Sequence, residues 1–216
     1  MRKTCIGLFH VVQFGDMENM GLTTKRIESL TDGIFAIAMT ILVLNLHLPD
    51  GGASSTNSML QHQLLGQANK IFNYFLSFVL LAVFWMVHHQ QFHVIKRTDR
   101  THLWINVLLL MFVALVPFST SLVGDFSSAW IDELCFSANL FIIGLLFYWN
   151  WSYATQQHRL VDETLEEKRI QLGKRRSLVL PVVSVLAMLT SYIFTPLATL
   201  VFILIPILLA LPGLKN

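Results

Sequence analysis

The side chains best suited to chemistry in this sequence lie in two apolar segments. Asp32 stands inside the first segment, and a histidine pair, His88 and His89, stands near the end of the second. A carboxylate inside an apolar segment is energetically costly, so it normally faces protein or water rather than lipid. Because imidazole titrates near neutral pH, Asp32 with His88 or His89 can form either a structural polar lock or a proton relay.

Histidine clusters also suggest metal binding, since imidazole is a common ligand of transition metals. The cluster here has the spacing His88-His89-x-x-x-His93. A membrane-bound metal oxidase needs several such clusters to hold a metal pair. The other histidines predicted near the same face stand alone in the sequence: His10, His102 and His158. We therefore expect no metal, no cofactor and no enzyme activity.

The first apolar segment also carries a ridge of aliphatic side chains. At 3.6 residues per turn, Ile37, Ile41 and Leu44 fall within an arc of about 60°, with Thr40 beside them. Asp32 lies about 140° from Ile37, on another face of the helix. Such a ridge suits a stripe that contacts lipid or protein, and it equally suits a hydrophobic constriction that gates a pore by dewetting.

The composition of the chain is that of a membrane protein. Of the 216 residues, 54% are hydrophobic and 13% are charged, and the mean hydropathy is +0.59. A typical soluble domain carries about 25% charged residues, so the polar surface is too small for a soluble domain of this size. The two cysteines, Cys5 and Cys135, offer neither a metal site nor a disulfide framework, and we expect both as free thiols.

Six apolar segments are long enough, or nearly so, to cross about 30 Å of hydrocarbon as helices. They span residues 27–48, 71–95, 103–123, 134–153, 178–195 and 196–211. The last two form one charge-free stretch that is too long for a single crossing. Thr195-Pro196 is its natural break, because the residue before a proline avoids the helical region. We therefore predict an all-α integral membrane protein with six transmembrane helices.

Basic residues set the orientation of these spans. Fourteen of the fifteen Lys and Arg residues lie on one side of the predicted topology, and only Lys70 lies on the other. Cytosolic loops carry the excess of Lys and Arg, so both termini are predicted to be cytosolic. The chain then divides into a cytosolic or interfacial segment 1–22, a transmembrane domain 23–212 and a cytosolic tail 213–216.

The segments between and within the spans carry weaker signals. Residues 49–70 are predicted as an outer loop, and residues 160–170 as a short solvated helix on the inner side. Asp132 and Glu133 suit a helix N-terminus, although they could also attract cations. Pro117, Pro181 and Pro206 are expected to bend their helices. The remaining polar side chains in the spans are expected to bond between helices: Asn73, Ser77, Asn106, Asn139, Asn150, Ser184 and Thr190.

The first span resembles the transmembrane protein 175 family of potassium channels, in its short prokaryotic branch. The family pattern stands here as RIESLTDG at residues 26–33, with Leu30 in place of an aromatic residue and Thr31 in place of serine. The second span adds the similar pattern Trp85-x-x-His88-His89. The resemblance covers residues 23–212.

This resemblance implies a potassium-permeable cation channel without a TVGYG filter, formed by four copies whose first helices line the pore. The hydrophobic constriction then falls on Ile37, Ile41 and Leu44, beside Thr40, which could help to dehydrate or coordinate potassium. A polar lock would surround it, formed by Arg26, Thr31, Asp32, Trp85, and His88 or His89. The implied partners are potassium ions and membrane lipid, with no nucleic acid, and the implied location is the cell (inner) membrane, with several crossings.

Two other functions remain open. A proton-coupled transporter would use Asp32 with His88 or His89 as a relay, although the inverted repeats and broken helices usual in transporters are not visible in the sequence. A non-conducting membrane scaffold would use the aliphatic ridge for packing. An Ile37→Asn substitution separates the three, because only a pore is expected to conduct more when its constriction becomes polar.

Overall fold

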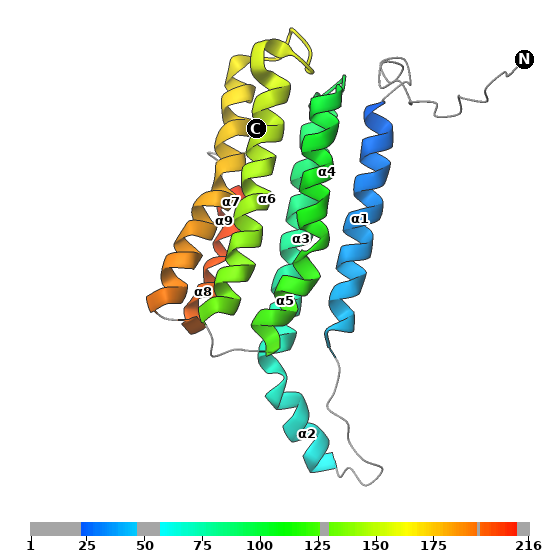
Figure 1. Cartoon of the computed structure of the whole chain (residues 1–216). Coiled ribbons are helices and arrows are strands. Elements are labelled where there is room, and N and C mark those ends of the chain that lie inside the picture. Colours follow the sequence, from blue (N-terminus) through cyan, green and yellow to red (C-terminus); the bar gives the residue numbers. More distant parts are fainter. Residues whose placement is uncertain (1–22, 47–56, 126–129, 194, 211–216) are drawn as a thin grey trace, which may run out of the picture.

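The computed structural model describes residues 23–46, 57–125, 130–193 and 195–210, and it is almost entirely helical (Figure 1). The predicted all-α fold is therefore confirmed for these residues. The predictions made for the two terminal segments lie outside the described residues, as do those for Cys5 and His10.

Within the described residues, five helical segments are long and apolar enough to cross a membrane. They run side by side in one bundle, with α1 at its edge (Figure 1). Their helices are α1 (Thr24–Leu44), α3 (Ala68–Val94), α4 (Arg100–Ala114) continued by α5 (Val116–Asp125), α6 (Trp130–Thr155) and α7 (Glu167–Ile193). These segments correspond to the first five predicted spans.

The residues of the predicted sixth span form, within residues 195–210, two short helices, α8 (Thr195–Val201) and α9 (Leu204–Ala210). Both pack against α7. The apolar stretch Ala198–Ala210 is shorter than the roughly 20 residues that a full crossing needs. The structure thus supports five spans, and the sixth crossing with its cytosolic C-terminus stays a prediction.

Two of the predicted proline bends coincide with helix breaks: Pro117 follows the break between α4 and α5, and Pro206 follows the one between α8 and α9. Pro181 lies inside the unbroken helix α7. Leu115 separates α4 from α5, and Pro117 lies in the first turn of α5. The break expected at Thr195-Pro196 comes slightly earlier, since α7 ends at Ile193 and α8 begins at Thr195. Pro196 therefore occupies the first helical turn, where a missing backbone N–H costs little.

The two connections differ from the prediction. The outer segment predicted as a loop contains helix α2 (Asn57–Gly66). The inner segment predicted as a helix over 160–170 is extended at its start, and α7 begins only at Glu167. Val161 pairs with Ile95 in an isolated antiparallel bridge, and Leu160 and Val161 are buried. Burial of these two apolar side chains, with backbone pairing, outweighs local helix propensity here.

Helices α6 and α7 make the most extensive contact of any two described helices in the bundle. Gly144 of α6 makes this approach possible, because a Cβ there would stand 2.6 Å from the ring of Pro181. Gly173 of α7 does the same against Trp151, whose ring would lie 2.3 Å from an added Cβ. The indole Nε1 of Trp151 also donates to the carbonyl oxygen of Ile170 at 3.0 Å. These contacts make α6 and α7 a fixed wall of the subunit.

Candidate functional site

Helix α1 buries one face and leaves the other exposed. The buried face contacts α3, α4 and α5. Its residues repeat every three or four positions, as one face of a helix requires: Ile27, Thr31, Phe35, Ala38 and Leu42. Because α1 lies at the edge of the bundle, its opposite face has no partner among the described residues of the subunit (Figure 1).

The aliphatic ridge predicted from the sequence lies on this exposed face. Ile37 is 59% exposed, Ile41 is 41% exposed and Leu44 is 72% exposed. Thr40 is exposed beside them, and its hydroxyl donates to the carbonyl oxygen of Ile37 at 2.8 Å. Since that bond uses the hydroxyl hydrogen, the lone pairs of Oγ1 remain available as acceptors. The ridge thus faces lipid, a pore or a neighbouring subunit, and not its own core.

Asp32 is joined to the rest of the subunit through tryptophan. The indole Nε1 of Trp85 donates to Oδ1 of Asp32 at 2.8 Å. The ring of His89 stacks on Trp85, with centroids 5.9 Å apart and planes at 24°. The sequence predicted a direct contact of Asp32 with His88 or His89. This prediction is wrong, because among the described residues the hydrogen bond of Asp32 is to Trp85 and none joins it to a histidine. Trp85 precedes His89 by one helical turn on α3, so the indole reaches the carboxylate and the imidazole lies behind it.

His88 belongs to a different polar network, inside the subunit. Its side chain is 2% exposed, and Nε2 lies 3.1 Å from Oδ1 of Asn106. The amide nitrogen of Asn106 already donates to Asn150 and to the carbonyl oxygen of His102. Oδ1 must therefore accept, so Nε2 of His88 carries the proton. His88 ties α3 to α4 and does not face Asp32 directly.

The network of His88 continues across four helices. Nδ2 of Asn150 donates to Oε1 of Gln91 at 2.9 Å. Nε2 of Gln91 in turn lies 3.3 Å from Oγ of Ser177 on α7. The chain of amides therefore links α3, α4, α6 and α7. Buried amides satisfied in this way fix the helices relative to one another.

The other polar residues expected to bond between helices divide into two groups. Asn139 donates to Ser119, and Thr120 donates to Ser77, so both pairs join different helices as predicted. Thr190 instead donates to the carbonyl oxygen of Leu186 in its own helix. Within the described residues the hydroxyl of Ser184 has no partner.

Asp132 and Glu133 lie in the first turn of α6, as predicted, but they are not solvated caps. Both are buried. Glu133 accepts a hydrogen bond from the hydroxyl of Thr199 on α8. The first turn of α6 is thereby attached to the short helices that follow α7.

Arg26 and Thr31 are not brought to Asp32 within the subunit. Arg26 is exposed near the start of α1. Thr31 is 1% exposed, and among the described residues its hydroxyl has no hydrogen-bond partner. Over the same residues, no three His, Cys, Asp or Glu side chains are placed to hold a metal ion. The site is therefore an apolar ridge with an adjoining Asp32–Trp85–His89 cluster.

Sequence reasoning found the ridge and Asp32 but missed how the cluster is connected. The sequence predicts Trp85 as a member of the polar lock, but not as the hydrogen-bond donor to Asp32. The role of Gln91 in the internal network was also missed. Its position near the end of an apolar span, one turn from His88, was the signal that could have indicated a buried partner.

The fold and this site define an all-helical, multi-span membrane protein with an apolar face on its first helix. Comparison with known proteins then identifies the family: residues 26–117 match the family model described as the endosomal/lysosomal potassium channel TMEM175. A potassium channel from Streptomyces collinus is 30% identical over 145 residues, which are 65% of this chain and 69% of that protein. One from Chamaesiphon minutus is 31% identical over 150 residues, or 68% and 73% of the two chains.

The structural comparison agrees. The crystal structure of a lysosomal potassium-selective channel TMEM175 homolog from Chamaesiphon minutus superposes with a TM-score of 0.77 at 27% identity, covering 88% of this chain and 97% of that one. The endosomal/lysosomal proton channel TMEM175 of Danio rerio is 24% identical over 200 residues, which are 90% of this chain but 37% of that protein. The chain belongs to the TMEM175 family. Because its relatives are channels, the prediction that it is not an enzyme is confirmed.

Proposed function

We propose that this chain is one subunit of a potassium-permeable cation channel whose pore is lined by α1. The observation that carries the proposal is the exposed ridge of Ile37, Ile41 and Leu44, which turns away from the core of its own subunit. The potassium-channel names of two bacterial relatives support the choice of ion. The proposed location is the cell (inner) membrane.

Four copies around one axis would turn the ridge into stacked hydrophobic rings. At about 1.5 Å rise per residue, Ile37, Ile41 and Leu44 occupy a length of roughly 10 Å. Branched aliphatic rings of this kind exclude water when narrow, so the closed pore would be dry. The homotetramer is part of the proposal, because a single subunit leaves the ridge open.

Selectivity in this channel would not use carbonyl rings, since the sequence lacks a TVGYG filter. Thr40 lies beside the ridge with the lone pairs of its hydroxyl unoccupied by a described donor. We assign Thr40 the role of replacing hydration water of potassium next to the constriction.

The Asp32–Trp85 hydrogen bond supports a lock that controls the position of α1. It joins α1 to α3 on the predicted inner side of the constriction. His89, stacked on Trp85, holds the indole plane. In this proposal Thr31 and His88 pack behind the lock, and Arg26 joins it only across a subunit boundary.

A proton-coupled transporter is the alternative from the sequence, and two observations bear on it. The broken helices that are usual in transporters are not visible in the sequence, but this structure has helix breaks at Leu115 and between α8 and α9. However, Asp32 bonds to an indole, which only donates and cannot pass a proton on, and His88 bonds to Asn106. The polar groups therefore do not form a continuous relay, which favours the channel.

Potassium flux in liposomes tests the proposed function. Purified protein is reconstituted with a potassium gradient against an impermeant cation, and wild type is compared with Ile37→Asn. Val43→Asn is the matched control, since Val43 is 48% exposed on α1 but lies off the ridge. Flux that rises in Ile37→Asn alone supports the pore. Absence of flux in folded, tetrameric wild type and Ile37→Asn protein contradicts it.

A further inference from the structure

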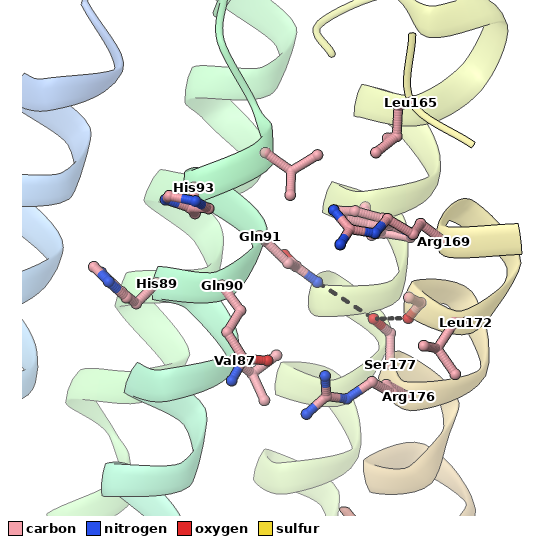
Figure 2. A pocket seen from close by; sticks show the side chains of 13 residues that line it. Val87, His89, Gln90, Gln91, His93, Leu165, Arg169, Leu172, Arg176 and Ser177 are labelled. Atoms are coloured by element: carbon pink, nitrogen blue, oxygen red, sulfur yellow. Dashed lines mark hydrogen bonds between the residues drawn. The ribbon is translucent and has the colours of Figure 1, made fainter. Parts of the chain in front are cut away.

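A cavity of about 390 Å³ lies between the end of α3 and the first turns of α7, with Trp151 of α6 also in its lining (Figure 2). It is separate from the ridge on α1. The ends of α3 and α7 that form it adjoin the loops on the basic, predicted cytosolic side of the membrane. The cavity therefore stands at the level where lipid headgroups meet the protein.

Two arginines give the cavity its charge. Arg169 and Arg176 are seven residues apart, two turns of α7, and so lie on the same face. Both guanidinium groups extend toward α3 (Figure 2). Among the described residues that line the cavity there is no carboxylate. The adjoining cavity is different in charge: Arg169 lines it too, but so do the carboxylates of Asp162 and Glu166.

Three of the other polar side chains of the cavity, Gln91, Ser177 and His89, are already engaged. Both ends of the Gln91 amide are used, toward Asn150 and toward Ser177. The ring of His89 points away from the arginines and stacks on Trp85 (Figure 2). The two guanidinium groups are always charged and therefore dominate the recognition of an anion, since they prefer planar, bidentate contact with phosphate or carboxylate.

The remaining lining is apolar and positioned by a rigid wall. Its aliphatic members are Val87, Val94, Leu165 and Leu172. The ring of Trp151 packs directly on α7, because Gly173 has no side chain there, and its indole N–H donates to the carbonyl oxygen of Ile170. A small hydrated anion gains nothing from such a lining, whereas the glycerol and first methylenes of a phospholipid do.

We propose that this cavity binds the phosphate headgroup of an anionic phospholipid from the inner leaflet, with Arg169 and Arg176 contacting the phosphate. Basic pockets between transmembrane helices on the cytosolic side suit such headgroups. Arg176 lies about 10 Å further along α7 than Arg169, a separation that two arginine side chains can bridge to contact one phosphate group. This inference does not depend on the channel proposal.

Lipid-dependent stability of the full-length protein in detergent tests the proposal. The melting temperature is followed while phosphatidylglycerol, phosphatidylcholine with the same acyl chains, or inorganic phosphate is added. The test variant is Arg169→Gln/Arg176→Gln. The matched control is Lys168→Gln/Arg175→Gln, which removes the same charge from the neighbouring positions outside the cavity lining.

We expect phosphatidylglycerol to raise the melting temperature of wild type and of the control variant. The concentration needed should rise by about tenfold or more in the cavity variant, as loss of charge-assisted contacts implies. An equal response in the two variants would overturn the assignment. A response of wild type to inorganic phosphate as strong as to phosphatidylglycerol would also overturn it, since the site would then take small anions.

A second measurement on wild type removes the dependence on a folded variant. A photoactivatable phosphatidylglycerol is crosslinked to the protein in vesicles, and the modified peptides are mapped. Labels on residues 87–94 and 165–177, competed by unlabelled phosphatidylglycerol but not by phosphatidylcholine, support the proposal. Labels spread evenly over the lipid-exposed helices contradict it.

Discussion

The indole Nε1 of Trp85 lies 2.8 Å from Oδ1 of Asp32, and this hydrogen bond joins α1 to α3 on a different face of α1 from the exposed aliphatic ridge. A carboxylate within an apolar span is costly unless protein or water solvates it, and the indole N–H contributes to that solvation. The bond therefore does two things at once: it satisfies Asp32 and it limits how far the first helix can move.

Replacing the donor should weaken this attachment. Trp85→Phe keeps an aromatic ring but removes the N–H, and we expect the folded protein to lose about 1 kcal/mol, the usual net value of one such bond. Asp32→Asn is the control, since its amide oxygen can still accept from the indole. Thermal unfolding of both variants in detergent measures the difference. If both variants lose the same free energy of unfolding, the hydrogen bond from Trp85 does not account for the contribution of Asp32 to stability.

The buried histidine should matter for stability rather than for proton transfer. His88→Leu leaves Oδ1 of Asn106 buried without its donor, which costs about 1–3 kcal/mol. His88→Gln restores an N–H and should recover part of the loss. His89→Leu, at an exposed position, should cost less. Unfolding curves decide the order, and a larger loss from His89→Leu would contradict this interpretation of the network.

The close approach of α6 and α7 predicts a sharp difference among glycines. Gly173→Ala places a Cβ 2.3 Å from the ring of Trp151, so one helix must move and the melting temperature should fall. Gly33→Ala meets no neighbouring atom within 4 Å and should be neutral or slightly stabilising, because alanine favours helix. If both variants melt alike, the packing described for α6 and α7 is wrong.

Thr40 should affect which ion passes rather than how much protein folds. Thr40→Val keeps the shape but removes the hydroxyl, so the potassium-to-sodium flux ratio should fall. Thr40→Ser keeps the hydroxyl and should retain most of the ratio. Liposome flux with each cation in turn provides the measurement. An unchanged ratio in Thr40→Val would remove Thr40 from the selectivity mechanism.

The sequence predicted the spans well because hydrocarbon thickness and charge leave few alternatives. The first five apolar segments all correspond to long helices. The helical bend after Leu115 followed from Pro117, whose ring disturbs the preceding turn. By contrast, α2 was missed, since a polar segment without a strong apolar face has no periodic signal.

The candidate site was predictable in its residues but not in its contacts. Periodicity alone placed Ile37, Ile41 and Leu44 on one face, and their exposure agrees with it. Whether Trp85 or His88 reaches Asp32 depends on the rotation of α3 against α1, which spacing along one helix does not fix. The internal network of Asn106 and Asn150 could not be predicted for the same reason, because it depends on how the helices pack.

The central claim is that α1 lines the conduction path, and cysteine modification tests it most directly. Leu44→Cys and Val43→Cys are made in a background with Cys5→Ser and Cys135→Ser. Leu44 lies on the ridge at the predicted outer end of α1, whereas its neighbour Val43 lies off it. A positively charged thiol reagent added from the outer side should reduce potassium flux through Leu44→Cys and leave Val43→Cys unchanged. Equal effects on the two variants, or none on Leu44→Cys despite its labelling, would contradict a pore lined by α1.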